Sequence, residues 1–308
     1  MPVAAFVINP TLLHDQNGFV RRGQAAAKEH GWEPDFAQTS EVSGALALAR
    51  RAVAAGAGLV FAAGGDGTVR ACAQALAGTG VPLAIVPLGT ANLTARALGV
   101  PRGAGRAMDA GFGGRDRVID VARLDGAGGS VIDLARVDGS GGSVFAAMAG
   151  IGLDAAVVAA AHERLKRRFG WAAYAMAGLT RLSLPPREFT VRLDDAEPIT
   201  RRARCVVVAN AGLLPGGFTL LPAARLDDGR LDVGVLAPGG PGGWLRVAGR
   251  VLARGRGLGQ PLESWQARRV VISADTDLLW QVDGEIAAPA RTLGVSVCPG
   301  ALVVRQPR

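Results

Sequence analysis

The residues Gly64-Gly65-Asp66-Gly67-Thr68 stand between an apolar run and a helical pattern. Glycines in such a turn let backbone N–H groups approach phosphate oxygens, and the N-terminus of a following helix adds positive potential. Asp66 cannot attract a phosphate itself, so it would bind the Mg²⁺ that accompanies ATP, directly or through water, or accept a proton. Because aspartate, glycine and threonine are also common turn and helix-capping residues, a turn without a ligand is the alternative.

A second loop lies in the segment 86–98 (VPLGTANLTARAL), after the next apolar run. If the two apolar runs are neighbouring parallel strands, both loops lie at their carboxyl ends, where open α/β sheets bind ligands. Thr68 and Thr90 can then both donate hydroxyl hydrogen bonds to a phosphate. The first loop has neither the Gly-Lys-Ser/Thr of a P-loop nor GxGxxG spacing, so the prediction rests on the two loops together.

The first hundred residues contain the elements that such a site needs. Strand-like runs cover 3–10, 33–40, 58–65 and 81–89, and helical patterns cover 11–30, 44–56, a segment that opens at Thr68, and 90–98 before Pro101. Strand–helix alternation with short connections predicts βαβ units and a parallel sheet, the architecture of an α/β domain.

The pattern changes after about residue 117. Short strands are predicted at 118–124, 131–137, 143–149, 187–193, 203–210, 231–236, 268–273, 278–282 and 293–297, with one long helical stretch at 154–182. Such a series predicts a second, mostly antiparallel domain. We therefore expect a nucleotide-binding α/β domain at 1–117 and a β-domain at 118–298. The final strand, 299–308, could return to either domain.

A tandem repeat lies at the expected junction, where residues 118–130 are followed at once by a near-identical copy at 131–143. A period that occurs only twice does not predict a solenoid. One interpretation is that the repeat forms an extra strand or hairpin. The favoured interpretation is a duplication whose additional copy forms a loop and does not affect the fold. The sequence leaves open whether Asp120 or Asp133 holds the original position.

The charge balance bears on the partners. The 308 residues carry a net charge of +8, which attracts polyanions such as nucleotides, nucleic acid or an anionic membrane surface, unless it only reflects arginine-rich codon bias. No interleaving of basic and aromatic residues marks a nucleic-acid platform, so no nucleic acid is expected. Cys72, Cys205 and Cys298 lie too far apart to suggest a disulfide framework or a zinc site. Without a signal-peptide pattern or 18 consecutive apolar residues, we expect a cytoplasmic protein, at most peripheral to a membrane.

The sequence resembles the diacylglycerol kinase catalytic-domain family, which includes bacterial lipid kinases, sphingosine kinases and ceramide kinases. The matching segments, in the family's order, are INP (8–10), QTSEVSGALALAR (38–50), GGDGT (64–68), PLGTANLTARALGV (87–100), FAAMAGIGLDA (145–155), LPAARLDDGRLDV (221–233) and QVDGE (281–285). The resemblance implies a nucleotide-binding α/β domain, a C-terminal antiparallel β-sandwich, and an active site in the interdomain cleft. It also implies transfer of the ATP γ-phosphate to a lipid hydroxyl in the presence of Mg²⁺.

Site residues follow from the same resemblance. It places ATP contacts at Asn9, Thr39, Gly64, Gly65, Asp66, Gly67, Thr68, Val69, Arg70 and Thr90. Glu285 matches the proposed proton acceptor, with Asp66 as a second catalytic residue. Asp228, with the carbonyls of Arg225 and Arg230, matches a metal site. The alternatives are a plain turn residue at Asp228 and a plain hairpin residue at Glu285.

The chain also departs from the family. Arg70 and Ala71 follow where many relatives have Asn-Glu, and Leu93 stands where many have aspartate, which removes an acid from a possible Mg²⁺–water network. The rival interpretations are an NAD kinase-like enzyme, which shares GGDGT, and a catalytically silent regulator that binds lipid or nucleotide. Diacylglycerol is the preferred acceptor, with a long-chain base or another lipid alcohol left open, as is a homodimer.

A lipid kinase without a membrane span must dock on the bilayer from solution. The segment 162–182 is the candidate docking surface, and a core helix with a solvated basic turn is the alternative. Its charged residues are Arg164, Lys166, Arg167 and Arg168, and its aromatic residues are Phe169, Trp171 and Tyr174.

Overall fold

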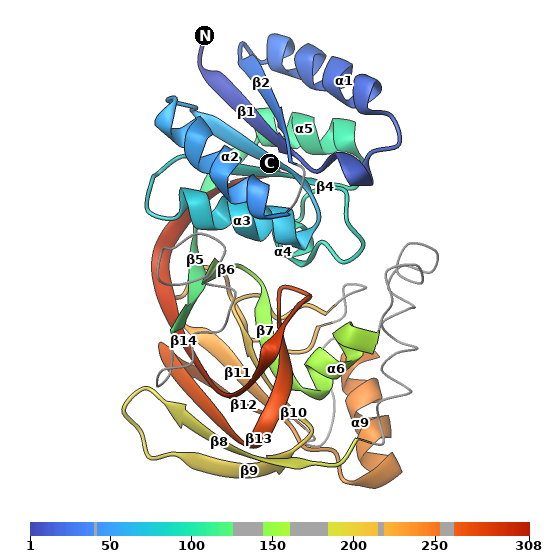
Figure 1. Cartoon of the computed structure of the whole chain (residues 1–308), viewed down its shortest axis with the longest axis vertical. Helices are drawn as coiled ribbons and strands as arrows, with labels where there is room; N and C mark the ends of the chain where they lie inside the picture. Colours follow the sequence, from blue (N-terminus) through green and yellow to red (C-terminus); the bar gives the residue numbers. More distant parts are fainter. Residues whose placement is uncertain (40–41, 126–143, 161–183, 215–218, 253–261) are drawn as a thin grey trace. The chain divides into compact units, whose positions relative to one another are not determined.

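A computed structural model describes all residues except 40–41, 126–143, 161–183, 215–218 and 253–261 (Figure 1). The chain divides into two compact units: unit 1 comprises Met1–Val121 and Gly300–Arg308, and unit 2 comprises Ala122–Pro299. It passes from one unit to the other within β5 (Arg115–Asp125) and returns within β14 (Glu285–Gln306). The closing residues, whose domain the sequence left open, therefore belong to unit 1.

Unit 1 is built on a parallel sheet in the order β4–β3–β1–β2. Its strands are β1 (Val3–Ile8), β2 (Glu33–Gln38), β3 (Leu59–Gly64) and β4 (Leu83–Pro87). The last residues of β14 add a parallel neighbour beyond β4, where Val304 lies opposite Leu83. β3 is buried along its whole length, which explains its continuous apolar sequence.

Helices cover both faces of this sheet (Figure 1). α1 (Gln16–Glu29) and α5 (Ala104–Gly113) pack against each other on one face, and α2 (Val42–Ala54) and α3 (Asp66–Leu76) pack against each other on the other. The core beneath α1 and α5 is aromatic. Phe6 stacks on Phe61 with ring centroids 4.3 Å apart, and Phe112 of α5 lies 4.7 Å from Phe61. This packing holds the strand ends that carry the glycine loops.

Unit 2 is an antiparallel β-sandwich with the strand order β12–β11–β10–β7–β13–β14. Hairpin β8–β9 joins the first half of β13, whereas β7 pairs with its second half. β13 changes partners across two irregularities between Ser273 and Trp280, and such bulges let one strand serve two layers. The elements are β6 (Val144–Phe145), β7 (Met148–Gly152), α6 (Leu153–Ala160), β8 (Arg187–Leu193), β9 (Ile199–Ala203), β10 (Cys205–Ala209), β11 (Leu231–Leu236), α9 (Gly240–Leu252), β12 (Leu262–Ala267) and β13 (Arg269–Val282).

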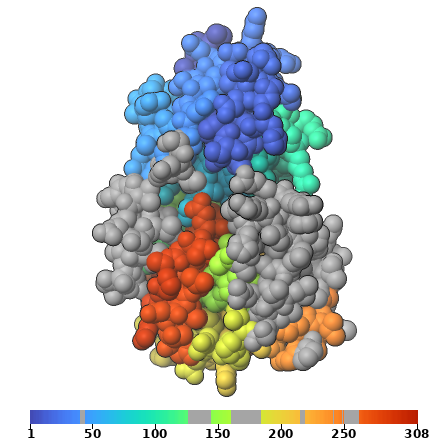
Figure 2. Space-filling view, turned by 45° about the vertical axis from the view of Figure 1, so that its right-hand side comes forward, coloured from blue at the N-terminus to red at the C-terminus, as the bar shows by residue number. Residues whose placement is uncertain are grey.

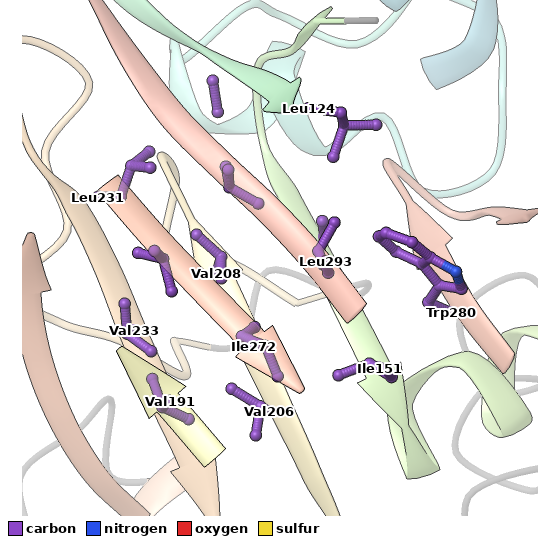
Figure 3. Close-up of a cluster of buried hydrophobic side chains, with 14 of the residues drawn as sticks. Leu124, Ile151, Val191, Val206, Val208, Leu231, Val233, Ile272, Trp280 and Leu293 are labelled. Atoms are coloured by element: carbon purple, nitrogen blue, oxygen red, sulfur yellow. The ribbon is translucent and has the colours of Figure 1, made fainter. Parts of the chain in front are cut away.

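The core of unit 2 is formed by alternate residues of these strands (Figure 3). Val206, Val208 and Val233 come from β10 and β11, and Ile272 and Trp280 come from the two halves of β13. The alternating sequence of β11 marked it as a strand, whereas β10 is apolar and buried along its whole length. Trp280 is fully buried and precedes the β13–β14 turn by three residues.

Several predicted elements are confirmed and others are wrong. Thr90 does not open a helix, because Asn92 adopts a left-handed backbone (φ 47°) and α4 (Leu93–Ala97) begins only after it. The strands predicted at 268–273 and 278–282 form the single strand β13. α5, α9, β9 and β12 were not predicted.

Two sequence predictions lie partly or wholly outside the described residues. α6 confirms the start of the helix predicted at 154–182, while its remainder, with the docking candidate 162–182, and the strand at 131–137 are not described. Within the described part of the chain, no helix is both long and apolar enough to cross a bilayer.

Candidate active site

The predicted ATP contacts of unit 1 gather at the carboxyl edge of its sheet. The four parallel strands end in register: Ile8 lies opposite both Gln38 and Ala63, and Gly64 lies opposite Pro87. Backbone hydrogen bonds continue the ladder one residue further, from Asn9 N to Ala63 O (2.9 Å), from Thr39 N to Ile8 O (2.8 Å) and from Leu88 N to Gly64 O (2.9 Å). The loops that carry Asn9, Thr39, Gly64–Arg70 and Thr90 therefore start from one edge, which the sequence predicted for the loops after β3 and β4.

Asp66 ties two of these loops together. It is the first residue of α3, and its carboxylate reaches across to the beginning of α4. Oδ2 accepts a hydrogen bond from the Asn92 backbone N–H (2.8 Å), and Oδ1 accepts one from the Leu93 N–H (2.6 Å). The N–H groups at a helix start lack intrahelical acceptors, so this carboxylate satisfies two of them. The loop after β3 thus fixes the loop after β4.

Asn92 and two glycines complete this junction. The Asn92 amide closes its own loop, because Oδ1 accepts from Gly89 N (3.1 Å) and Nδ2 donates to Gly89 O (2.6 Å). A Cβ on Gly89 would lie 2.7 Å from Gly65 Cα, a separation that real side chains do not adopt. The two backbones can approach this closely only because Gly89 has no side chain.

The residues of the GGDGT segment differ in their exposure. Gly65, Asp66 and Gly67 are half-buried, and so is Thr90. Thr68 is 2% exposed, with its side chain packed over Gly64, and Arg70 is 8% exposed. A ligand at this edge would therefore meet the first turn of α3 chiefly through its backbone. The N–H groups of Asp66, Gly67 and Thr68 belong to this first turn, where α-helices leave donors for an anion.

Arg96, which the sequence analysis did not assign to the site, lies next to this junction. Its Nε donates to the Ala91 carbonyl (2.7 Å), so the guanidinium folds back over the start of α4. Burial lowers the pKa of Arg96 and the nearby Arg102 lowers it further, whereas the Asp66 carboxylate raises it. The only sequence signal was the Ala-Arg that follows PLGTxN.

The remaining ATP candidates form smaller turns at the same edge. Asn9 caps a 3₁₀ turn (Pro10–Leu12), and its Oδ1 accepts from Thr11 N (3.1 Å) and Thr11 Oγ1 (2.8 Å). Thr39 is 4% exposed and packs near Gly44 of α2. The Asn9 side chain therefore shapes the backbone after β1, whereas Thr39 is buried at the end of β2.

Unit 2 holds the other catalytic candidate, Glu285. It is the half-buried first residue of β14 and lies opposite Val282 across a two-residue turn. The turn residues Asp283 and Gly284 both have positive φ, 46° and 82°, as a type I′ turn requires. The Asp-Gly of the DGE segment is thus the turn itself, and Glu285 is the residue that the turn presents.

Asp283 is anchored more firmly than a turn requires. Its buried carboxylate accepts from the backbone N–H groups of Ala146 (3.2 Å), Ala147 (3.1 Å) and Met148 (2.9 Å), and its own N–H donates to Met148 O (2.8 Å). A buried carboxylate needs such donors. Asn210 supports the same segment, because Nδ2 donates to Ala146 O (3.3 Å). Neither residue had a role that could be assigned from the sequence alone.

The metal candidates lie in the turn before β11. Asp228 Oδ1 accepts from Arg230 N (3.0 Å), and Arg225 forms an ion pair with Asp227 at 3.5 Å. Burial raises the pKa of the nearby Asp232, which the Asp228 charge raises further, whereas a hydrogen bond from Gln266 lowers it. A carboxylate flanked by backbone carbonyls suits Mg²⁺, which takes oxygen ligands and retains water. The described residues contain no group of three or more His, Cys, Asp or Glu side chains placed to hold a metal ion.

Comparison with known proteins places the chain in a family. Residues 4–124 match the model of the diacylglycerol kinase catalytic domain, and residues 147–306 match that of the YegS C-terminal NAD kinase beta sandwich-like domain. A probable lipid kinase YegS-like of Pseudomonas aeruginosa is 35% identical over 94% of this chain and 90% of its own length. The chain belongs to the diacylglycerol kinase catalytic-domain family. As a member of this family, it is a kinase.

Further relatives agree with this membership. A diacylglycerol kinase of Mycobacterium tuberculosis is 30% identical over 85% of this chain and 81% of its own length. A crystal structure of a diacylglycerol kinase from Bacillus anthracis shares the fold, with a TM-score of 0.69 and 20% identity over 99% of this chain and 96% of that one. An NAD kinase from Archaeoglobus fulgidus is more distant, with a TM-score of 0.52 and 10% identity over 100% and 94% of the two chains. NAD kinases thus share the fold at a greater structural distance than the diacylglycerol kinase does.

Proposed function

We propose that this kinase transfers the γ-phosphate of ATP to the hydroxyl of a lipid, with diacylglycerol as the acceptor and phosphatidate as the product. The observation that carries the proposal is the Asp66 junction. One carboxylate fixes the loops after β3 and β4 to each other at the edge of the sheet where the first turn of α3 offers backbone donors. Phosphoryl transfer depends mainly on positioning and charge neutralisation, and such a fixed edge supplies both.

Unit 1 binds ATP in this proposal. The N–H groups of Asp66, Gly67 and Thr68 in the first turn of α3 hold phosphate oxygens, with Asn9, Thr39 and Thr90 on the neighbouring loops. Because both Asp66 oxygens already accept backbone hydrogen bonds, we assign Asp66 to fixing the loops and not to accepting the hydroxyl proton. Arg96 adds positive charge beside the junction.

Mg²⁺ would be held by Asp228 with the carbonyls of Arg225 and Arg230, and it would supply positive charge at this turn of unit 2. The turn itself is preformed, because the Asp228–Arg230 hydrogen bond sets its shape. Mg²⁺ suits such a site, because it takes oxygen ligands from carboxylates and keeps several of its waters.

Unit 2 supplies the base. A lipid alcohol has a pKa far above 7, so a carboxylate that takes its proton during attack lowers the barrier. Glu285 fits this role, because it is half-buried and is held by an anchored turn. The proton leaves the hydroxyl for Glu285 as the hydroxyl oxygen bonds to the γ-phosphorus and the bond from phosphorus to the ADP oxygen breaks.

The test is transfer of labelled γ-phosphate from ATP to a panel of acceptors in mixed micelles. The panel contains diacylglycerol, a long-chain base, a third lipid alcohol and NAD. We expect labelled phosphatidate, which depends on Mg²⁺. Transfer to another lipid alone would keep the kinase assignment and correct the acceptor. Labelled NADP, or ATP binding without any transfer, would contradict the proposal.

A further inference from the structure

A second anchor of the Asp283–Gly284 turn consists of two residues, Gln281 and Asp154, that have been assigned no role so far. Gly284 N donates to Oε1 of Gln281 (2.7 Å), and Nε2 of Gln281 donates to Oδ2 of Asp154 at the start of α6 (2.7 Å). Asp283 fixes one residue of the turn and this chain of two hydrogen bonds fixes the other. Both bonds are short for N–H donors and oxygen acceptors.

The orientation of the Gln281 amide is determined by its partners. A backbone N–H can only donate, so the amide atom that faces Gly284 must be the oxygen, and the nitrogen must face Asp154. Gln281 is 2% exposed, so water cannot readily replace either partner. Without the Asp154 acceptor, the buried N–H of Gln281 would be unsatisfied, and the hydrogen bond that orients the Gln281 amide would be lost.

The fold reserves space for Asp154. β7 residue Gly150 lies opposite Gln281, and a Cβ on Gly150 would collide with the Asp154 carboxylate. Burial raises the pKa of Asp154, and the hydrogen bond from Gln281 partly offsets this increase. Asp154 as a whole residue is half-buried. A carboxyl group kept in such surroundings costs stability unless it is satisfied by hydrogen bonds.

The hairpin that these residues brace reaches the surface. Figure 2 shows atoms of β13 and β14 (red) exposed beside those of residues 144–160 (light green). Ile286, which follows Glu285 and lies opposite Gln281, is 38% exposed. Hydrogen bonds inside the unit hold the turn, and the outer side of the hairpin is exposed. Both features suit Glu285, which must be held in place and must also reach a substrate.

We propose that Gln281 and Asp154 are positioning residues that fix the Asp283–Gly284 turn and thereby the carboxylate of Glu285. This inference rests on the proposed function of Glu285 as the base. Neither residue contacts the reacting atoms in this account: Asp154 acts on Gln281, and Gln281 acts on the backbone of the turn. A displacement of about 1 Å at a reacting group can cost on the order of 100-fold in rate.

The experiment measures kcat and the KM for ATP of the full chain with diacylglycerol. Gln281→Leu removes both hydrogen bonds, and we expect kcat to fall about 10-fold to 100-fold with the KM for ATP within about twofold of wild type. Gln266→Leu is the matched control, because Gln266 on β12 donates to Asp232 on β11 (3.3 Å) in the same unit. We expect that control to retain the wild-type kcat.

A donor–acceptor exchange distinguishes positioning from general damage to the fold. Gln281→Glu keeps the acceptor for Gly284 but places two acceptors against each other, so kcat should fall. Adding Asp154→Asn reverses the hydrogen bond, because the amide at position 154 now donates to the carboxylate at position 281. We therefore expect kcat to recover at least partly. If the double variant does not recover, or if Gln281→Leu and Gln281→Glu both fold and keep the wild-type kcat, the inference is wrong.

Coupling to Glu285 separates this inference from the proposal on which it rests. In a Glu285→Gln background, Gln281→Leu should cause no further loss of kcat, because there is no base left to position. Losses that multiply would overturn the positioning role while leaving Glu285 as the base. If Glu285→Gln alone keeps the wild-type kcat, the base assignment fails, and the positioning role fails with it.

Discussion

At the scale of single residues, Asp66 shows how far a motif predicts a role. The sequence placed it in a glycine loop and offered Mg²⁺ binding or proton transfer as its chemistry. In the structure its two oxygens accept the N–H groups of Asn92 and Leu93. That role depends on the left-handed conformation of Asn92 and on where α4 begins, and neither could be derived from the order of residues alone.

We predict that Asp66→Ala abolishes phosphoryl transfer while the protein remains folded. The change leaves two backbone N–H groups without their acceptor, at a cost of about 1–3 kcal/mol for each group that water does not reach. Transfer assays and urea unfolding of the same preparation measure both effects. Asp109→Ala, at an exposed position of α5, is the control and should match wild type. Wild-type transfer by folded Asp66→Ala protein would contradict the prediction.

A pH-dependent stability difference is predicted for Asp154. Burial raises its pKa in the folded protein above the unfolded value of about 3.9, so the folded state binds the proton more tightly. Stability from this group is therefore present at low pH and is lost as pH rises through the folded pKa. Asp154→Asn lacks this loss, so its stability relative to wild type should increase from about pH 4 to about pH 7. Urea midpoints at both pH values provide the measurement, and an unchanged difference would show that the carboxyl group is not desolvated.

At the scale of elements, the predictable helices and strands are those whose apolar residues form a continuous run or recur at a regular spacing. β3, β8 and β11 follow from their apolar runs or alternation and are confirmed. The 22-residue strand β14 was predicted as two separate strands, at 293–297 and within 299–308, because Pro289, Pro299 and Gly300 interrupt its pattern. Tertiary pairing overrides those local signals, since β14 pairs with β13 in unit 2 and with β4 in unit 1. The brace formed by Asp154 and Gln281 joins residues 127 positions apart, which no local pattern reports.

The two copies of the tandem repeat allow the same substitution to be compared at equivalent positions, Asp120 and Asp133. In the structure the first copy supplies β5, where buried Asp120 accepts a hydrogen bond from Gly300 N (2.8 Å). Asp120→Ala should therefore lower the free energy of unfolding by about 1–3 kcal/mol. Asp133→Ala makes the same change in the second copy, which lies outside the described residues, and should be neutral. A neutral Asp120→Ala variant beside a destabilised Asp133→Ala variant would show that the first copy is not the one that holds this position.

At the scale of the whole molecule, the α/β unit and the antiparallel unit were both predictable, because the period of the hydrophobic pattern changes near residue 117. The motif order indicated the family, and the family models match both parts of the chain. The acceptor lipid was not predictable, because the volume and lining of a lipid site depend on packing between distant segments.

Membrane docking belongs to this scale as well. We propose that the net charge of +8 attracts the kinase to anionic bilayers, with the basic residues of 162–182 as the main contributors. Each basic residue near the surface contributes about 1 kcal/mol at low salt. Replacing Arg164, Lys166, Arg167 and Arg168 by glutamine should therefore reduce sedimentation with anionic vesicles by orders of magnitude. Binding that equals wild type and ignores salt would place the docking surface elsewhere.

The central claim, phosphoryl transfer to a lipid hydroxyl with Glu285 as the base, is tested most directly by one variant. Glu285→Gln keeps the size of the side chain and removes its basicity. We predict a loss in kcat of roughly 100-fold or more for phosphatidate formation, with ATP affinity largely retained in a parallel binding measurement. A wild-type kcat in this variant, or a loss confined to ATP affinity, would contradict the account.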